Sequence, residues 1–311
     1  MATLKKRITI SLKNTDDIKR TETMKQLKQI RKFYTDLSKE INKKIKQMGG
    51  EDLQRYNLIL LQRDITNRLN DIQEQITNGI QRSMLNVTRY VKVDTIQFLE
   101  SLGFKAKDLG NAFAYVPDMI VRNIVNGNIY KQYGGGEWQL STAIWGDNQR
   151  TISDIYRIVA EGTAQGKNAY DVAKDLEKYV NPTVRKDWNW SKVYPGTKKV
   201  VDYSAQRLAR TMITHAYQQA FEEMHRDDPF VTEYIWRISN NHDRVCDICK
   251  ARNGRHYRKG RVPLDHPNGM CTLEPYIPYT SKQIGDRIAD WYNNPTGSDP
   301  DLDRYAQRFV Q

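Results

Sequence analysis

Three cysteines and one histidine in the C-terminal third of the chain have the spacing of a metal site. Cys246 and Cys249 form a C-x2-C pair, and His266 and Cys271 follow after a loop of sixteen residues. A C-x2-C pair places two thiols where one ion can contact both, and a Cys3His set closes a tetrahedral zinc site. Because protein ligands then fill all four positions, we expect a structural zinc ion with no open position for water.

Two other interpretations of these cysteines stay open at this stage. All three could be ordinary reduced thiols, or Cys246 and Cys249 could form a redox pair. A catalytic pair of Arg210 and His215 is not favoured, because residues five apart on a helix share a face poorly. We therefore expect both to be structural and assign no catalytic residue.

The segments around the cysteines are predicted to be short strands at residues 233–238, 255–257 and 272–276, bounded by Gly and Pro. Together they form a small β-knuckle. It has too few apolar residues to be stable without a cross-link, which again favours a bound metal.

The N-terminal third is predicted to be helical. Residues 15–48 carry an apolar stripe in three- and four-residue steps, with Thr15 or Asp16 as the N-cap. Gly49-Gly50 ends this helix, and a second, longer one follows at residues 51–102. Two such helices would form a long antiparallel hairpin, buried stripe against stripe.

The expected fold class is mainly α with a small β-knuckle (α+β). We expect a basic helical hairpin arm at residues 1–110 and a helical body at 111–231. A β-knuckle with the Cys/His cluster follows at 232–280, and a C-terminal tail peptide at 281–311. Its last segment, LDRYAQRFVQ, is expected to bind a partner. Residues 185–200, with two Trp and five basic groups, resemble an insert.

The net charge of +12 is concentrated in one segment. Residues 1–48 contain 14 Lys and Arg against 5 Asp and Glu, a balance of +9. Such a basic arm is typical of contact with a phosphate backbone, or with an acidic protein surface. No base-reading motif is present, so DNA binding should be non-specific. The candidate contact residues are Lys5, Lys6, Arg7, Lys25, Lys28, Arg31, Lys32, Lys43, Lys44 and Lys46.

Two motif blocks resemble the Mu F-like head morphogenesis proteins, the minor head proteins of tailed bacteriophages. The first is S-x-x-I-W followed by G-x-x-x-G-x-x-x-x-x-V-A-x-D-L at residues 141–176. The second is D-R-V-C-D-I-C, N-G-R-H-Y and H-P-N-G-M-C-T-L-E-P at residues 243–275. That family usually ends in H-P-x-C-x-C, and Gly269 stands where the first of those cysteines would be. This departure makes His266 the expected fourth ligand.

The resemblance covers roughly residues 120–277 and implies a structural protein of the phage head. Its partners would be the portal, the major capsid or scaffold protein, and the packaged DNA. Its place would be the virion head interior near the portal vertex, with the host cytoplasm during assembly. The role would be head assembly, or genome packaging or ejection. No apolar run is long enough for a membrane span, and no signal peptide is expected.

Two rival functions are retained. C-x2-C followed by D-H-P-N is also similar to treble-clef (HNH-like) DNA nucleases, in which a histidine activates water beside a divalent metal. Such a site needs a further ligand, and Asn268 is the only candidate after His266. A stand-alone DNA-binding accessory protein would instead bind DNA tightly without a portal partner.

Overall fold

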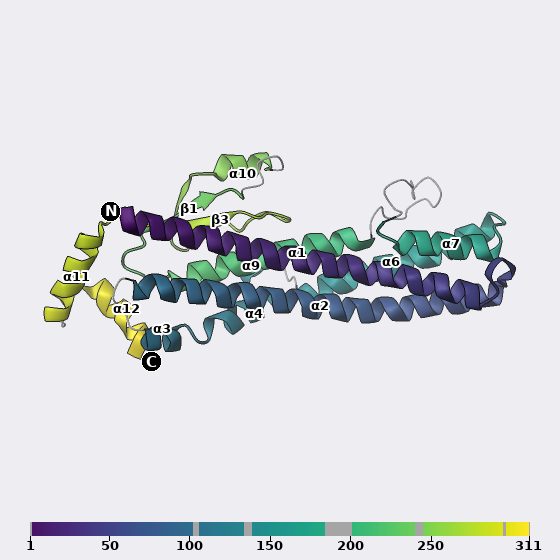
Figure 1. Cartoon of the computed structure of the whole chain (residues 1–311), viewed down its shortest axis with the longest axis horizontal. Helices are drawn as coiled ribbons and strands as arrows, with labels where there is room; N and C mark the ends of the chain where they lie inside the picture. The colour runs from purple at the N-terminus through teal and green to yellow at the C-terminus, as the bar shows by residue number, and fades with distance from the viewer. Residues whose placement is uncertain are drawn as a thin grey trace. The chain divides into compact units, whose positions relative to one another are not determined.

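The computed structural model describes residues 2–101, 106–133, 139–183, 201–239, 245–294 and 297–310. These residues are mostly helical (Figure 1). They also contain one three-stranded antiparallel sheet in the strand order β2-β1-β3. The expected fold class, mainly α with a small β-knuckle, is confirmed at this level. The elements are α1 (Ala2–Gln47), η1 (Gly50–Asp52), α2 (Arg55–Glu100), α3 (Ala106–Ala112), α4 (Val116–Val125), α5 (Asn128–Gln132), α6 (Leu140–Ala164), α7 (Ala169–Val180), α9 (Val201–Met224), β1 (Glu233–Arg237), α10 (Asp247–Arg252), β2 (His256–Arg258), β3 (Thr272–Tyr276), α11 (Ser281–Asn293) and α12 (Pro300–Val310).

The two long helices α1 and α2 bury the apolar stripes that the sequence predicts. Ile30 and Ile41 of α1, and Leu61 and Ile80 of α2, are each at most 1% exposed. Burial of these stripes is what stabilises both helices, since few of their other positions are strongly apolar.

The start of α1 differs from the prediction, whereas its end agrees. α1 begins at Ala2, and Thr15 lies inside it. The Thr15 hydroxyl donates to the carbonyl of Ser11 at 2.9 Å, one turn earlier, instead of accepting from an N–H ahead of it. At the other end, Gly49 and Gly50 take φ values of 111° and 57°, which stops the helix.

The chain divides into two compact units. Unit 1 contains residues 1–23, 81–137 and 210–311, and unit 2 contains residues 24–80 and 138–209. The long helices α1, α2 and α9 each contribute one part to each unit. Both units are discontinuous in sequence, and the segments 1–110, 111–231, 232–280 and 281–311 stay a prediction.

In unit 2, polar contacts join α1 to its neighbours. Lys44 of α1 forms an ion pair with Asp64 of α2, and Ser38 of α1 donates to Glu177 of α7. Asn148 of α6 donates to two side-chain amides on α2. Residues 24–47 of α1 are thus packed into unit 2 and do not stand apart from it.

The sheet of unit 1 is centred on β1, which pairs antiparallel with both other strands. Tyr234 lies opposite Tyr257 of β2, and Trp236 lies opposite Leu273 of β3. Tyr234 and Trp236 are each 1% exposed. The three predicted strands agree with β1, β2 and β3 to within about one residue, because short apolar runs between Gly and Pro mark them well.

The C-terminal tail folds onto unit 1. Ile284 of α11 and Leu302 of α12 form a buried cluster with Phe230, and Trp291 packs against it. The last segment, residues 302–311, was expected to bind a partner. Its Leu302 side chain packs inside unit 1, against Phe230 and Ile284.

Two further expectations concern other parts of the chain. The insert at residues 185–200 lies outside the described residues. Among the residues that are described, no helix has both the length and the apolar composition that a membrane span needs.

Replacing Leu302 by Ala should destabilise unit 1 by about 2–5 kcal/mol, because the substitution leaves a cavity beside Phe230 and Ile284. Urea unfolding measures this change. The matched control is Gln307→Ala on the exposed face of α12, which should change stability by less than about 0.5 kcal/mol. Equal effects of the two substitutions would show that the tail does not pack in solution.

Candidate metal centre

The C-x2-C pair lies at the start of a short helix. Cys246 is the N-cap residue of α10, and its Sγ accepts the backbone N–H of Cys249 at 3.5 Å. Gly254, with φ 76°, follows the end of this helix and leads the chain back to the sheet. The sequence predicted only a tight turn here. The helical turn serves the same purpose, because it brings both thiols to one side of the chain.

His266 faces these two thiols. Its Nε2 lies 3.0 Å from Cys246 Sγ and 3.0 Å from Cys249 Sγ. Its other ring nitrogen, Nδ1, lies 2.9 Å from the carbonyl oxygen of Pro267. A carbonyl can only accept, so Nδ1 carries the proton and the lone pair of Nε2 points at the thiols. That is the tautomer a metal-binding histidine needs.

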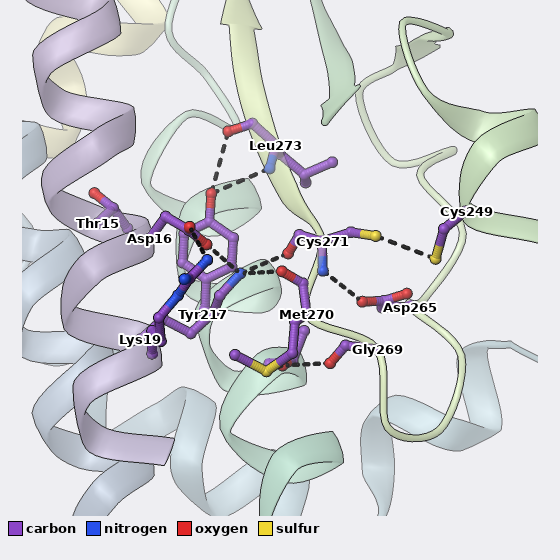
Figure 2. A network of polar contacts seen from close by, with 12 residues as sticks. Thr15, Asp16, Lys19, Tyr217, Cys249, Asp265, Gly269, Met270, Cys271 and Leu273 are labelled. Atoms are coloured by element: carbon purple, nitrogen blue, oxygen red, sulfur yellow. Dashed lines mark hydrogen bonds and ion pairs between the residues drawn. The ribbon is translucent and has the colours of Figure 1, made fainter. Parts of the chain in front are cut away.

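Cys271 completes the predicted set from the other side. Its Sγ lies 3.2 Å from Cys249 Sγ (Figure 2). The potential ligand atoms form two overlapping groups, each within 4.8 Å: Cys246, Cys249 and His266, and then Cys249, Asp265 and Cys271. The structure thus brings all four predicted ligands together around Cys249, as a group that could hold a metal ion.

The donor chemistry of this group fits a cation. Burial raises the pKa of the Cys249 and Cys271 thiols, and the negative charge of Asp265 raises both further. A bound metal would supply the positive charge that lets these thiols ionise. Trp236 Nε1 is buried and makes no hydrogen bond within the described residues. Its indole nevertheless opposes the upward shift of the Cys271 pKa that burial causes. A thiolate there would satisfy this donor.

Asp265 is the residue that the sequence analysis missed. It is 4% exposed, and its carboxylate accepts two backbone N–H groups, from His266 at 2.9 Å and from Cys271 at 3.0 Å. One side chain therefore orients both ligands of the second pair. The signal was present in the sequence as an aspartate directly before the ligand histidine.

Gly269 is explained by the same carboxylate. A Cβ atom at position 269 would collide with all three carboxyl atoms of Asp265. The φ of Gly269 is not positive, so the requirement is for space and not for an unusual backbone conformation. The departure from the family pattern at this position is therefore linked to Asp265, which occupies the space of a side chain at 269.

Helix α9 holds the loop that carries these residues. His215 Nε2 bonds the carbonyl of Asp265 at 3.0 Å, and Thr214 donates to the carbonyl of Gly269 at 2.9 Å. Gln218 donates to the carbonyl of Pro263 at 2.8 Å and accepts the N–H of Asp265 at 3.1 Å. Residues 214, 215 and 218 lie on one face of the helix, so a single helix surface fixes the loop.

The residues that were predicted to be structural contact this loop as well. Burial lowers the pKa of His215, which keeps the ring neutral. Because Nε2 bonds a carbonyl, Nδ1 accepts from the hydroxyl of Tyr130 at 3.0 Å. Arg210 donates to Asn268 Oδ1 at 2.7 Å, and Asn268 has a left-handed φ of 71°. Asn tolerates this conformation better than most residues do.

Helix α1 reaches the same loop through one buried lysine. Lys19 is 0% exposed, and its ammonium group donates to the carbonyls of Met270 at 2.9 Å and Cys271 at 2.7 Å (Figure 2). Burial lowers its pKa, and the neighbouring carboxylates of Asp16 and Asp265 oppose this shift. Lys19 contributes to the balance of +9 in residues 1–48, which was expected to face a partner, but its own partners lie inside the molecule.

The basic residues predicted to contact a partner are mostly exposed. The side chains of Lys5 and Arg7 lie outside the described ones. Lys44 is only partly exposed and pairs with Asp64, so it is less available than the sequence suggested. The exposed members are Lys6, Lys25, Lys28, Arg31, Lys32, Lys43 and Lys46.

Comparisons with known proteins add nothing to the geometry of the site. Compared with protein-family models, curated proteins and solved structures, the chain has no match. The resemblance to head morphogenesis proteins therefore stays a prediction that rests on its motifs.

Substituting Gly269 by Ala should weaken metal binding and lower the unfolding midpoint, because the new methyl group displaces the Asp265 carboxylate from both ligand N–H groups. Asp265→Ala should do the same by removing the acceptor, at a cost of about 1–3 kcal/mol for the orphaned donors. Total metal per chain and thermal unfolding measure both effects.

The double substitution Asp265→Ala with Gly269→Ala is the informative control. Once the carboxylate is gone, the methyl group has nothing to displace. The metal content and the unfolding midpoint of the double variant should therefore be no lower than those of Asp265→Ala alone. Additive losses would show that Gly269 and Asp265 act independently.

Proposed function

We propose that the chain is a structural minor head protein of a tailed phage, with a closed zinc centre that stabilises its knuckle. The observation that carries the structural role is the group around Cys249. Four protein ligands converge there, and α1 and α9 hold the loop that carries two of them. No step of catalysis is assigned to any residue.

Zinc is the metal that this ligand set suits best. Three thiols and one imidazole are soft and borderline ligands, which select zinc over magnesium or calcium. Zinc would be held by Cys246, Cys249, His266 and Cys271, while Asp265 orients two of them without binding it. The ion would be structural, because protein groups occupy every tetrahedral position.

The nuclease alternative receives no support from the contacts. His266 turns Nε2 toward two thiols, and its Nδ1 bonds the adjacent carbonyl of Pro267. Asn268, the only candidate for a further ligand after it, accepts from Arg210 through its side-chain oxygen. The Nε2 atom of His266 therefore faces the proposed zinc ligands, and the side-chain oxygen of Asn268 is occupied by Arg210.

The long hairpin is also part of the proposal. In unit 2, Glu40 pairs with Arg68 and Lys44 pairs with Asp64, so residue numbers rise along α1 as they fall along α2. In unit 1, Glu22 accepts from Asn86. Within each unit, these pairs support the antiparallel arrangement of α1 and α2 that the proposed hairpin requires.

The motif resemblance supplies the setting of the proposed function. It is the basis for a proposed location in the virion head interior near the portal vertex, and in the host cytoplasm during assembly. The portal protein and the major capsid or scaffold protein are the proposed protein partners. Packaged DNA is the proposed nucleic-acid partner, contacted through the exposed basic residues without sequence preference. The role lies in head assembly, or in genome packaging or ejection.

Purified wild-type protein should contain about one zinc ion per chain by elemental analysis. Cys249→Ser and His266→Ala should each lose this metal together with several kcal/mol of local stability, because binding and folding of the knuckle are coupled. The matched control is His256→Ala. His256 also lies between the cysteines in sequence, but it is exposed and pairs with Glu233. Metal-free wild-type protein with an intact knuckle would contradict the zinc assignment.

Co-expression with the portal, scaffold and major capsid proteins of the same phage should yield heads that contain this chain. The expected route is binding to the portal, so heads assembled without portal protein should lack it. Quantitative mass spectrometry of purified heads measures both outcomes. Complete absence from portal-containing heads would falsify the proposed function.

A further inference from the structure

Six lysines form a straight row on the outer face of α1 within unit 2. All six side chains are exposed, and we call this set the lysine row: Lys25, Lys28, Lys32, Lys39, Lys43 and Lys46.

Helix geometry aligns these residues closely. The first, third, fourth and last of them are separated by steps of seven residues, and each step returns to nearly the same face with a drift of about 20°. The other two fall within the same arc, which is about 60° wide at 100° per residue. With a rise of 1.5 Å per residue, the row is about 32 Å long.

The lysine row faces away from the core of unit 2. Ile30, Leu37 and Ile41, which form the buried stripe of α1, are at most 2% exposed and lie on nearly the opposite side of the helix. The row is therefore presented outward by a helix whose other face is fixed by packing.

The charge of the lysine row is almost uncompensated. Asp36 lies at the edge of the arc and pairs with Lys32. The other five lysines have no ion pair with any carboxylate in the described part of the chain. Six lysines and one aspartate leave this face with a net charge of +5.

The lysine row differs from the set of basic residues that the sequence predicted to contact a partner. Lys39 was absent from the residues predicted from sequence, and it lies in the middle of the row. Lys44 was among them, but it lies on the flank where Asp64 pairs with it. Arg31 is exposed but falls outside the arc.

The chemistry of the row selects a linear polyanion. Within the arc every residue is a lysine, and Asp36 lies about 20° beyond its edge. No apolar or aromatic side chain is therefore available in the arc as an anchor for a protein partner. An anionic membrane surface would need an apolar face beside the charges, which the arc also lacks. A nucleic-acid duplex presents one negative charge per about 1.7 Å along a straight axis, or about 18 charges along the row.

We propose that the lysine row binds double-stranded nucleic acid lengthwise, through phosphate contacts and without reading bases. Lysine ammonium groups act as point charges with no fixed geometry, which suits a backbone and not a base edge. The inference rests on the proposed function, in which packaged DNA lies within reach of the chain, and it names the surface that meets this DNA.

Two variants of equal charge test the proposal by titration with a random-sequence DNA duplex at several salt concentrations. The row variant replaces four lysines by Gln: Lys25, Lys32, Lys39 and Lys46. The control variant replaces four exposed arginines of α1 and α2 outside the row by Gln: Arg31, Arg55, Arg63 and Arg82. All eight side chains are exposed, so circular dichroism and the melting temperature should match wild type for both variants.

About five phosphate contacts predict a log–log salt slope of roughly −4 to −5 for the wild-type protein. Its affinity should therefore fall about 500-fold between 50 and 200 mM salt. The row variant should lose on the order of 100-fold in affinity at low salt, with a slope near −1. The control variant should keep the wild-type slope, since the net charge alone does not define a contact surface.

Several outcomes would overturn the inference. One is a row variant that keeps the wild-type slope, and another is equal weakening by the two variants. A third is wild-type protein that binds anionic vesicles or polyglutamate but no duplex. Incorporation into heads separates this test from that of the proposed function. A chain that enters heads without binding a duplex contradicts only the inference, and a chain that binds a duplex through the row but never enters heads contradicts only the head function.

Discussion

The carboxylate of Asp265 is the interaction on which the geometry of the Cys/His group, the candidate metal centre, depends. It is buried, and it accepts the backbone N–H groups of both His266 and Cys271. A buried carboxylate is tolerated only when its oxygens have donors, and these two donors belong to ligand residues. The geometry of the second ligand pair is thus set by one side chain. The glycine at position 269 follows from it, because any larger residue would occupy the place of the carboxylate.

The loop around Asp265 has no regular structure of its own, so its conformation is imposed by the helices beside it. Thr214, His215 and Gln218 of α9 bond its backbone in three places. From α1, the ammonium group of Lys19 bonds two successive carbonyls. Removing a charged group from water is unfavourable, and Lys19 is stable there because these carbonyls and Asp16 replace its hydration. The N-terminal part of α1 is consequently part of the support of the knuckle.

The same helix uses lysine in two opposite ways. At position 19 the side chain is an internal cross-link, and from Lys25 to Lys46 the lysine row is directed outward. The difference follows from helical phase, because the buried face of α1 cannot accept an unpartnered charge. A count of basic residues treats both kinds alike, and therefore overstates the charge that any partner can reach.

Much of this protein could be predicted from its sequence, where the determining interactions are local. The C-x2-C pair, His266 and Cys271 were recognisable because metal ligands recur at short, characteristic spacings. The stripes of α1 and α2 and the three strands were predictable because helical and strand periods appear directly in the pattern of apolar residues. The stop at Gly49-Gly50 was predictable for the same local reason.

Only the tertiary structure decided how distant residues are used. Lys19 and Cys271 are 252 residues apart, and no local pattern links them. The role of Asp265 depends on Gly269 and on α9, and Lys44 is less available to a partner because Asp64 of α2 pairs with it. The last segment, residues 302–311, was expected to bind a partner because an amphipathic segment alone does not reveal what covers it. In the structure Leu302 packs against Phe230. Periodicity shows that a face must be buried, but its partner depends on the whole fold.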